Sequence, residues 1–168
     1  MKSIQVSYKG TKYRSKLEAT TAKFFCEHGI EFIYEPEVFE FRDGTRYTPD
    51  FYLPEQQIWV ECKGVMTDEC EHKIEMLANE CKEELVVVIN SDGRFSVVES
   101  EYEYGWCGKG TSLLAHCRKC GKWYFFPEGG GWNCRHCDFY DGDTTFDFCC
   151  NGNEGLPDFQ FDIWEDAD

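Results

Sequence analysis

The chain has 168 residues, of which 32 are acidic and 17 basic, for a formal net charge of −15. Hydrophobic residues make up 42% of the chain, enough for a sizeable folded core, and no apolar run is long enough to cross a membrane. We therefore expect no membrane association, and the acidity argues against a protein that covers nucleic acid with a broad basic surface.

The first predicted elements are a short hairpin and a helix. Residues 4–8 and 11–14 flank a Lys-Gly turn as two strands. Apolar side chains recur at helical spacing over residues 15–29, with a serine as N-cap and a glycine as stop signal. Ser15 and Glu18 fit a capping box, in which the glutamate reaches back to the amide of the cap residue. The same first-turn position would also let Glu18 ligate or orient a metal ion.

Two further strands, at residues 47–54 and 58–64, alternate aromatic or branched side chains with polar ones. If their turn is centred between residues 55 and 56, Asp50 lies directly opposite Glu61. Cross-strand partners have Cβ atoms about 4.5–5.5 Å apart, and like charges at that distance destabilise a sheet unless a cation lies between them. The pattern therefore predicts a site for a divalent cation, although a slip of one residue would send the two carboxylates to opposite faces.

Glu61 and Lys63 lie two residues apart and therefore share a face of the second strand. A Glu-x-Lys tripeptide is most often a solvated ion pair. Here it follows residues 58–60, which are apolar on both faces, and charges at the end of a buried strand are costly without partners. Cys62 points to the other face, and we expect it to be part of the core.

Beyond residue 64 the pattern continues as an α/β unit. Residues 68–84 have the spacing of an amphipathic helix, and residues 85–89 and 95–98 are short strands. Residues 1–104 are thus predicted to form one α/β domain, a mixed sheet flanked by helices.

The motifs in this domain resemble those of a known superfamily. Three motifs occur in an order similar to that in the PD-(D/E)XK nucleases: Glu18 in Ser-Lys-Leu-Glu, then Pro49-Asp50, then Glu61-Cys-Lys63. Within that superfamily, residues 31–35, 47–51 and 60–64 resemble phage endonuclease I, a Holliday-junction resolvase. The likeness runs from about residue 13 to about residue 99 and implies a restriction-endonuclease-like fold.

The resemblance also implies a role for each site residue. Asp50 and Glu61 would bind magnesium or manganese, and Glu18 would complete the site. Lys63 would activate the attacking water or stabilise the developing charge; the sequence leaves both roles open, because nearby carboxylates favour its protonated form and desolvation opposes it. The resemblance further implies a DNA substrate with branches or junctions, cut by a homodimer.

A second module, residues 105–140, contains two CxxC pairs. Cys117 and Cys120 are followed, after 13 residues, by Cys134 and Cys137. This spacing is typical of a structural zinc site, and the stretch between the pairs is too short to fold around a core of its own. It resembles a zinc ribbon.

Other ligands and two disulfides are the alternatives for this module. His116 and His136 adjoin the cysteines and could replace one of them as ligands. Disulfides are disfavoured because the chain shows no signal peptide, so we expect the cytoplasm of a bacterial or phage-infected cell.

Charge separates the last segment from the module before it. Residues 105–137 carry five basic side chains and one acidic, whereas residues 138–168 carry ten acidic and none basic. Aromatic residues interrupt the acids, so the predicted tail at 141–168 is a segment that packs its rings on the domain, covers the chain's own basic surface, or recruits a protein partner.

Taken together, the sequence predicts a metal-dependent DNA endonuclease with a catalytic magnesium ion and a structural zinc ion. Two other functions fit parts of the pattern. One is an inactive binding module that uses the ribbon, and the other is an acidic inhibitor that mimics DNA. The intact Asp50, Glu61 and Lys63 argue against the first, and the basic ribbon argues against the second.

Overall fold

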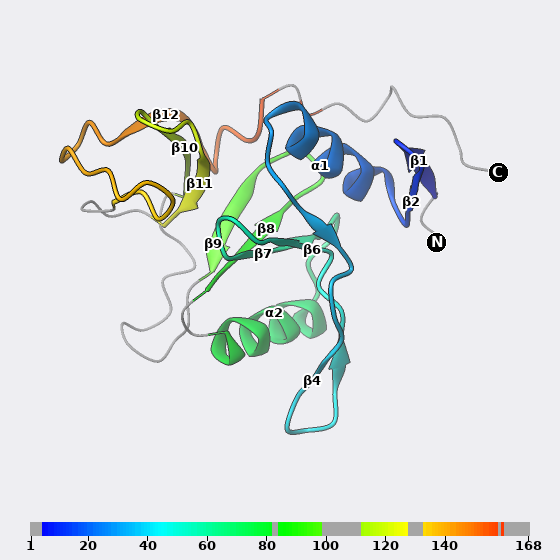
Figure 1. Cartoon of the computed structure of the whole chain (residues 1–168). Helices are drawn as coiled ribbons and strands as arrows, with labels where there is room; N and C mark the ends of the chain where they lie inside the picture. Colours follow the sequence, from blue (N-terminus) through cyan, green and yellow to red (C-terminus); the bar gives the residue numbers. More distant parts are fainter. Residues whose placement is uncertain (1–4, 82–83, 99–111, 128–132, 158, 160–168) are drawn as a thin grey trace.

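The computed structural model describes residues 5–81, 84–98, 112–127, 133–157 and 159. Cys107 and most of residues 158–168 lie outside this part of the chain. The described part is a mixed α/β protein in which two helices flank a five-stranded sheet and a small three-stranded sheet packs beside them (Figure 1).

The central sheet has the strand order β3-β6-β7-β8-β9. The strands are β3 (Ile33–Tyr34), β6 (Phe51–Leu53), β7 (Ile58–Cys62), β8 (Leu85–Ile89) and β9 (Phe95–Val98). Neighbours are antiparallel except β7 and β8, which are parallel and are joined by a helical crossover. The predicted α/β class and the mixed sheet are thereby confirmed.

Helices α1 (Lys16–Glu27) and α2 (Asp68–Glu80) cover opposite faces of this sheet (Figure 1). The α1 face is closed by one apolar cluster that includes Phe25, Phe51 and Val60, and the α2 face by another that includes Trp59 and Leu77. Alternate residues of β6 and β7 therefore enter different clusters, as the two-residue period of a strand requires. Cys62 belongs to the α1 face, so its predicted place in the core is confirmed.

The register of β6 and β7 is the predicted one. Phe51 pairs with Val60, Tyr52 with Trp59 and Leu53 with Ile58. The next residue outward on each strand is Asp50 and Glu61 respectively, so the two carboxylates meet where the paired strands end.

Two small hairpins lie outside the central sheet. The predicted N-terminal hairpin is confirmed as β1 (Val6–Tyr8) and β2 (Thr11–Tyr13). A second hairpin, β4 (Phe39–Glu40) and β5 (Arg46–Tyr47), projects beyond the helices (Figure 1) and was not predicted. Phe39 packs edge-on against Trp59 with ring centroids 5.0 Å apart, so this hairpin extends the apolar cluster on the α2 face.

The small sheet has the order β11-β10-β12. It includes a strand beyond residue 140, where the ribbon module was predicted to end. Its strands are β10 (Leu113–Cys117), β11 (Trp123–Phe126) and β12 (Phe146–Asn151). Because β12 pairs with β10, part of the segment expected to be a tail is a strand of the ribbon sheet. Phe146 packs on Phe126 at 4.7 Å between ring centroids, as expected if the aromatic residues of this segment are structural.

The ribbon sheet has two apolar faces. One face, with Ala115 and Tyr124, packs around the cysteines. The other face contributes Leu114, Phe125 and Cys150 to the same cluster that α1 closes. The ribbon is therefore part of the main core rather than a separate body.

Main-chain contacts join the end of the ribbon to β9. The amide of Phe95 donates to the carbonyl of Gly152 at 3.1 Å, and the amide of Val97 donates to the hydroxyl of Ser112 at 2.8 Å. A Cβ atom on Gly152 would lie 2.1 Å from the carbonyl oxygen of Phe95, so this position has no room for a side chain.

We predict that Gly152→Ala destabilises the protein by about 1–3 kcal/mol, because the added methyl must push the ribbon and β9 apart. The matched control is Gly64→Ala, at a position where a Cβ atom would meet nothing within 4 Å. Urea unfolding of the two variants and the parent measures the difference. Equal stability of both variants would contradict the close approach at Gly152.

Candidate active site

Asp50 and Glu61 form a buried carboxylate pair at the ends of β6 and β7. Each is 2% exposed. The amide of Asp50 donates to Oε2 of Glu61 at 3.2 Å, and the amide of Cys62 donates to Oδ2 of Asp50 at 2.8 Å. The hairpin register thus brings the two acids together and supplies each with a main-chain donor.

Lys63 lies beside this pair. Its Nζ atom is 2.9 Å from Oε1 of Glu61, and its amide donates to the carbonyl of Ile89 at 3.0 Å, which fixes its backbone to β8. Burial acts to lower the pKa of Lys63, but the charge of Glu61, its hydrogen bond and the charge of Asp50 together outweigh burial, so the pKa is raised. The lysine is therefore a protonated, positively charged group at neutral pH in this arrangement.

Glu18 approaches the site from the first turn of α1. The amide of Glu18 donates to Oγ of Ser15 at 3.1 Å, so Ser15 is the predicted N-cap. The carboxylate reaches back to the amide of Arg14 at 3.0 Å, not to that of Ser15, and accepts from the hydroxyl of Tyr34 at 2.6 Å. Glu18 thus helps to cap α1 and also lies close enough to Asp50 to affect its pKa.

Arg14 and Glu35 are site residues to which the sequence assigned no role there. The Nη2 atom of Arg14 lies 3.1 Å from Oδ1 of Asp50, and its Nε atom lies 2.7 Å from Oε1 of Glu35. Arg14 precedes Glu18 by four residues, a spacing at which opposite charges meet, and this was the available signal.

The site favours a cation. Burial, Glu61 and Glu18 raise the pKa of Asp50 well above its usual range, so its ionised form needs a positive partner. The hydroxyl of Tyr47 is buried and has no hydrogen-bond partner among the described residues. Burial and the negative charge of Glu61 raise its pKa. Such an orphaned hydroxyl beside two carboxylates fits a site that is completed by a further ligand.

These residues fit magnesium. Magnesium commonly binds one or two carboxylates and keeps several waters and substrate oxygens in its shell. Asp50 and Glu61 supply two such carboxylates, and Tyr47 a hydroxyl that could meet the shell.

The four predicted zinc ligands come together in the ribbon. In the described part of the chain, the donor atoms of Cys117, Cys120, Cys134 and Cys137 form a group that lies within 4.8 Å of one another, and His116 and His136 are not in it. Two sulfur pairs, Cys117 with Cys137 and Cys120 with Cys134, are 3.6 Å apart. A tetrahedral ion with bonds of about 2.3 Å needs sulfurs about 3.8 Å apart, so the cluster fits zinc.

Tyr124 supports the thiolate form of one ligand. Its hydroxyl lies 3.4 Å from Sγ of Cys134. Burial alone would raise the pKa of Cys134, but hydrogen bonds, the largest from Tyr124, lower it to about 6. Because zinc binds the thiolate, this hydroxyl favours metal binding.

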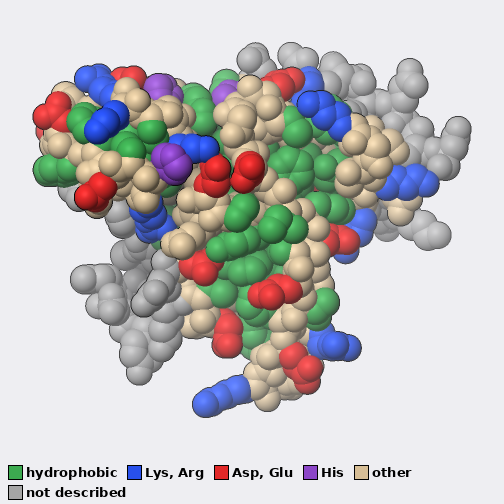
Figure 2. Space-filling model, viewed as in Figure 1, with side chains coloured by type: hydrophobic (Ala, Val, Ile, Leu, Met, Phe, Trp, Pro, Cys, Tyr) green, Lys and Arg blue, Asp and Glu red, His purple; other side chains and the backbone are tan. Residues whose placement is uncertain are grey.

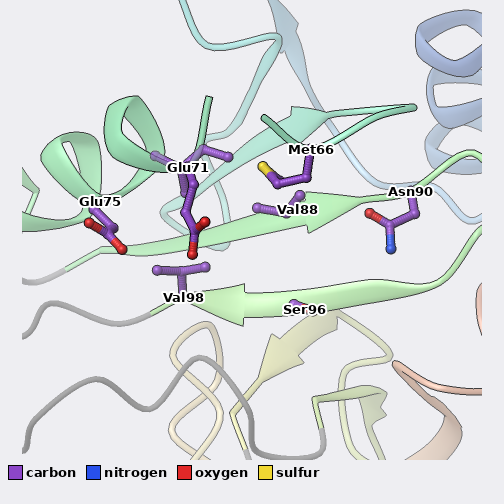
Figure 3. Close-up of a pocket in the computed structure, with 8 residues that line it drawn as sticks. Met66, Glu71, Glu75, Val88, Asn90, Ser96 and Val98 are labelled. Carbon is purple, nitrogen blue, oxygen red and sulfur yellow. The ribbon is translucent and has the colours of Figure 1, made fainter. Parts of the chain in front are cut away.

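A pocket of about 260 Å³ lies between α2 and strands β8 and β9 (Figure 3). Val88, which lines this pocket, is the strand neighbour of Glu61, but neither Asp50 nor Glu61 lines the pocket. Its lining includes Glu71 and Glu75 and no basic side chain, which disfavours a phosphate group there.

A mixed sheet flanked by helices, a buried pair of acids beside a lysine, and a four-cysteine cluster together define an α/β scaffold with a buried acidic site. The family model of phage endonuclease I matches residues 2–124, so the chain belongs to the phage endonuclease I family, a family of nucleases. The match contains Glu18, Asp50, Glu61 and Lys63 and ends at Tyr124, between the two CxxC pairs. No curated protein matches the chain. None of the helices in the described residues is long and apolar enough to cross a membrane.

We predict one zinc ion per chain, bound by the four clustered cysteines, and loss of this ion in Cys134→Ser. Cys149→Ser, outside the cluster, is the control and should keep the ion. Elemental analysis of reduced protein measures the stoichiometry. Because the ribbon face with Leu114 and Phe125 belongs to the main core, removing zinc should lower the unfolding temperature of the whole chain. Purified, reduced protein without zinc would contradict the assignment.

Proposed function

We propose that this protein is a magnesium-dependent endonuclease that hydrolyses phosphodiester bonds of DNA, with branched or junction DNA as its substrate. The observation that carries the proposal is the buried Asp50–Glu61 pair beside Lys63, in a chain of the phage endonuclease I family. The order of elements around this pair also supports a restriction-endonuclease-like fold of the PD-(D/E)XK superfamily.

Each residue has a proposed task. Asp50 and Glu61 would hold the ion, which supplies an acidified water and offsets charge on the leaving oxygen. Lys63, protonated because Glu61 lies 2.9 Å away, would present its charge to the phosphate and stabilise the developing negative charge. Glu18 would orient the shell of the ion from the start of α1. Manganese, with similar ligand preferences, would substitute for magnesium.

DNA would approach over the N-terminal hairpin. Lys9, Lys12 and Lys16 lie on this hairpin and at the start of α1, near Arg14 and the acidic pair. Figure 2 shows Lys and Arg side chains over this end of the molecule. Basic side chains there would contact the DNA backbone, although the whole chain is acidic. The place of action would be the cytoplasm of a phage-infected bacterium.

Three basic residues of the ribbon are less available to DNA because they contact other parts of the protein. Lys122 pairs with Glu55 at 2.6 Å, Arg118 with Asp147 at 2.7 Å, and Arg135 donates to the carbonyl of Gln56 at 3.2 Å. These contacts favour a bracing role for the ribbon over that of a DNA-binding module. An inactive binding module would have no need of the intact acidic pair.

We predict metal-dependent cleavage of branched DNA that is abolished in Asp50→Ala and Glu61→Ala. Lys63→Ala should reduce the rate by about 10²–10³-fold, since it removes one charge that stabilises the transition state. The control is Glu69→Ala, which removes an exposed acid of α2 paired only with Lys73 in the ion pairs of the structure. Gel assays on labelled junction, flap, nicked and linear DNA, with and without magnesium, give the rates.

The same assay tests Glu18 with Glu18→Gln, which keeps an acceptor for the amide of Arg14 and loses the charge. We expect a fall of about 10–100-fold with an unchanged unfolding temperature. Full activity of this variant would leave Glu18 with the capping role alone. Efficient cleavage by folded Asp50→Ala would overturn the proposed site altogether.

We also predict that the active species is a homodimer, because symmetric cutting of a junction needs two sites related by a two-fold axis. Light scattering at assay concentrations should give twice the mass of the 19.6 kDa chain. A monomer with full junction-cleaving activity would contradict this.

A further inference from the structure

The guanidinium of Arg14 lies on one carboxylate oxygen of Asp50, one of the two buried acids of the site. Its Nη2 atom is 3.1 Å from Oδ1 of Asp50, which is 2% exposed, whereas the side chain of Arg14 is 55% exposed. Arg14 therefore reaches from solvent into the position where a cation would be bound. Nη2 also lies 3.8 Å from Oε1 of Glu18.

The other carboxylate oxygens of the pair already have donors from the fold. Oδ2 of Asp50 accepts from the amide of Cys62, and Oε2 of Glu61 accepts from the amide of Asp50. Oε1 of Glu61 is paired with Lys63. Oδ1 of Asp50 differs from these three oxygens. In the described residues its partner is the exposed side chain of Arg14, rather than a backbone amide or the nearby Lys63.

Glu35 provides a second holding point for the same side chain. Its Oε1 atom is 2.7 Å from Nε of Arg14. Glu35 has a φ of 48°, in the left-handed region that non-glycine residues rarely adopt, and its amide donates to the carbonyl of Asp50 at 2.8 Å. The backbone of Asp50 therefore fixes the position of the acid that holds Arg14.

These two contacts differ in what they can do. The Nε contact with Glu35 anchors the guanidinium beside the site, and the Nη2 contact with Asp50 is the one that a stronger cation can replace. In the part of the chain that the structure describes, the four acids Glu18, Glu35, Asp50 and Glu61 form ion pairs with Arg14 and Lys63, which leaves two negative charges. One divalent ion neutralises that excess, so the site can take the ion without expelling Arg14 from the neighbourhood.

We infer that Arg14 is a positioning residue. In the free protein it occupies the cation position at Asp50. When the ion binds, Arg14 keeps its contact with Glu35 and rotates toward the DNA phosphate. This rests on the proposed function. Arg14 then has two opposite effects: it weakens metal binding to the free protein and strengthens cleavage of bound DNA. A residue that only braces the fold would not separate these effects.

The test compares Arg14→Gln and Arg14→Lys with Lys23→Gln. Lys23 lies on α1 and forms an ion pair with Glu27 at 3.4 Å, so its variant makes the same change in charge in a pair that contains no site residue. Manganese binding to DNA-free protein is measured by calorimetry at pH 8. Single-turnover cleavage of junction DNA is measured at saturating manganese, and thermal unfolding shows that each variant is folded.

Arg14→Gln should bind manganese about 3–10-fold more tightly, because the competing cation is gone, and should cleave about 10–100-fold more slowly. Lys23→Gln should leave manganese binding unchanged. Arg14→Lys, which keeps the charge but lacks the forked geometry, should bind manganese with an affinity between those of the parent and Arg14→Gln. If Arg14→Gln does not fold, the manganese affinity of Arg14→Lys tests the inference.

Unchanged or weaker manganese binding in a folded Arg14→Gln or Arg14→Lys variant would overturn the inference while leaving the proposed function intact, provided that the parent cleaves DNA. A parent protein that neither binds manganese nor cleaves DNA would instead refute the proposed function.

Discussion

The buried pairing of two like charges is the constraint on which the rest of this site depends. The β6–β7 register places Asp50 against Glu61 at a strand end that is closed to solvent, where an uncompensated carboxylate is strongly unfavourable. Three neighbouring groups offset that cost. The amide of Cys62 supports Asp50, Lys63 supports Glu61, and Arg14 approaches from the helix side. Two apolar residues would remove the cost, so stability alone does not account for an acidic pair at this position.

Local signals account for what the sequence predicted correctly. The Ser15 cap, the Lys-Gly turn of the first hairpin, the short β6–β7 turn and the CxxC pairs are each encoded within a few residues. The register follows from the turn alone, and it brings Asp50, Glu61 and Lys63 together without knowledge of the rest of the fold.

Contacts between distant segments account for what was missed. The β4–β5 hairpin depends on packing against Trp59, and β12 depends on pairing with β10, neither of which leaves a local pattern. Strand β12 also lies within the acidic segment of residues 138–168, whose charge indicated a tail. Arg14 and Glu35 are separated by the whole of α1, and their meeting at Asp50 is fixed only by the tertiary fold.

The hydrogen bonds from Phe95 and Val97 to the ribbon have a consequence for solubility. Strand β9 ends the central sheet, and a strand in that place presents unpaired amides that can pair with another molecule and start aggregation. Here the carbonyl of Gly152 and the hydroxyl of Ser112 accept hydrogen bonds from those two amides, so the ribbon protects this edge of the sheet. An ancestral or engineered form without the ribbon would have to protect β9 in another way, by a charged or proline-bearing replacement. The four-cysteine cluster belongs to the same ribbon, so a metal bound there would also help to protect β9 from such pairing.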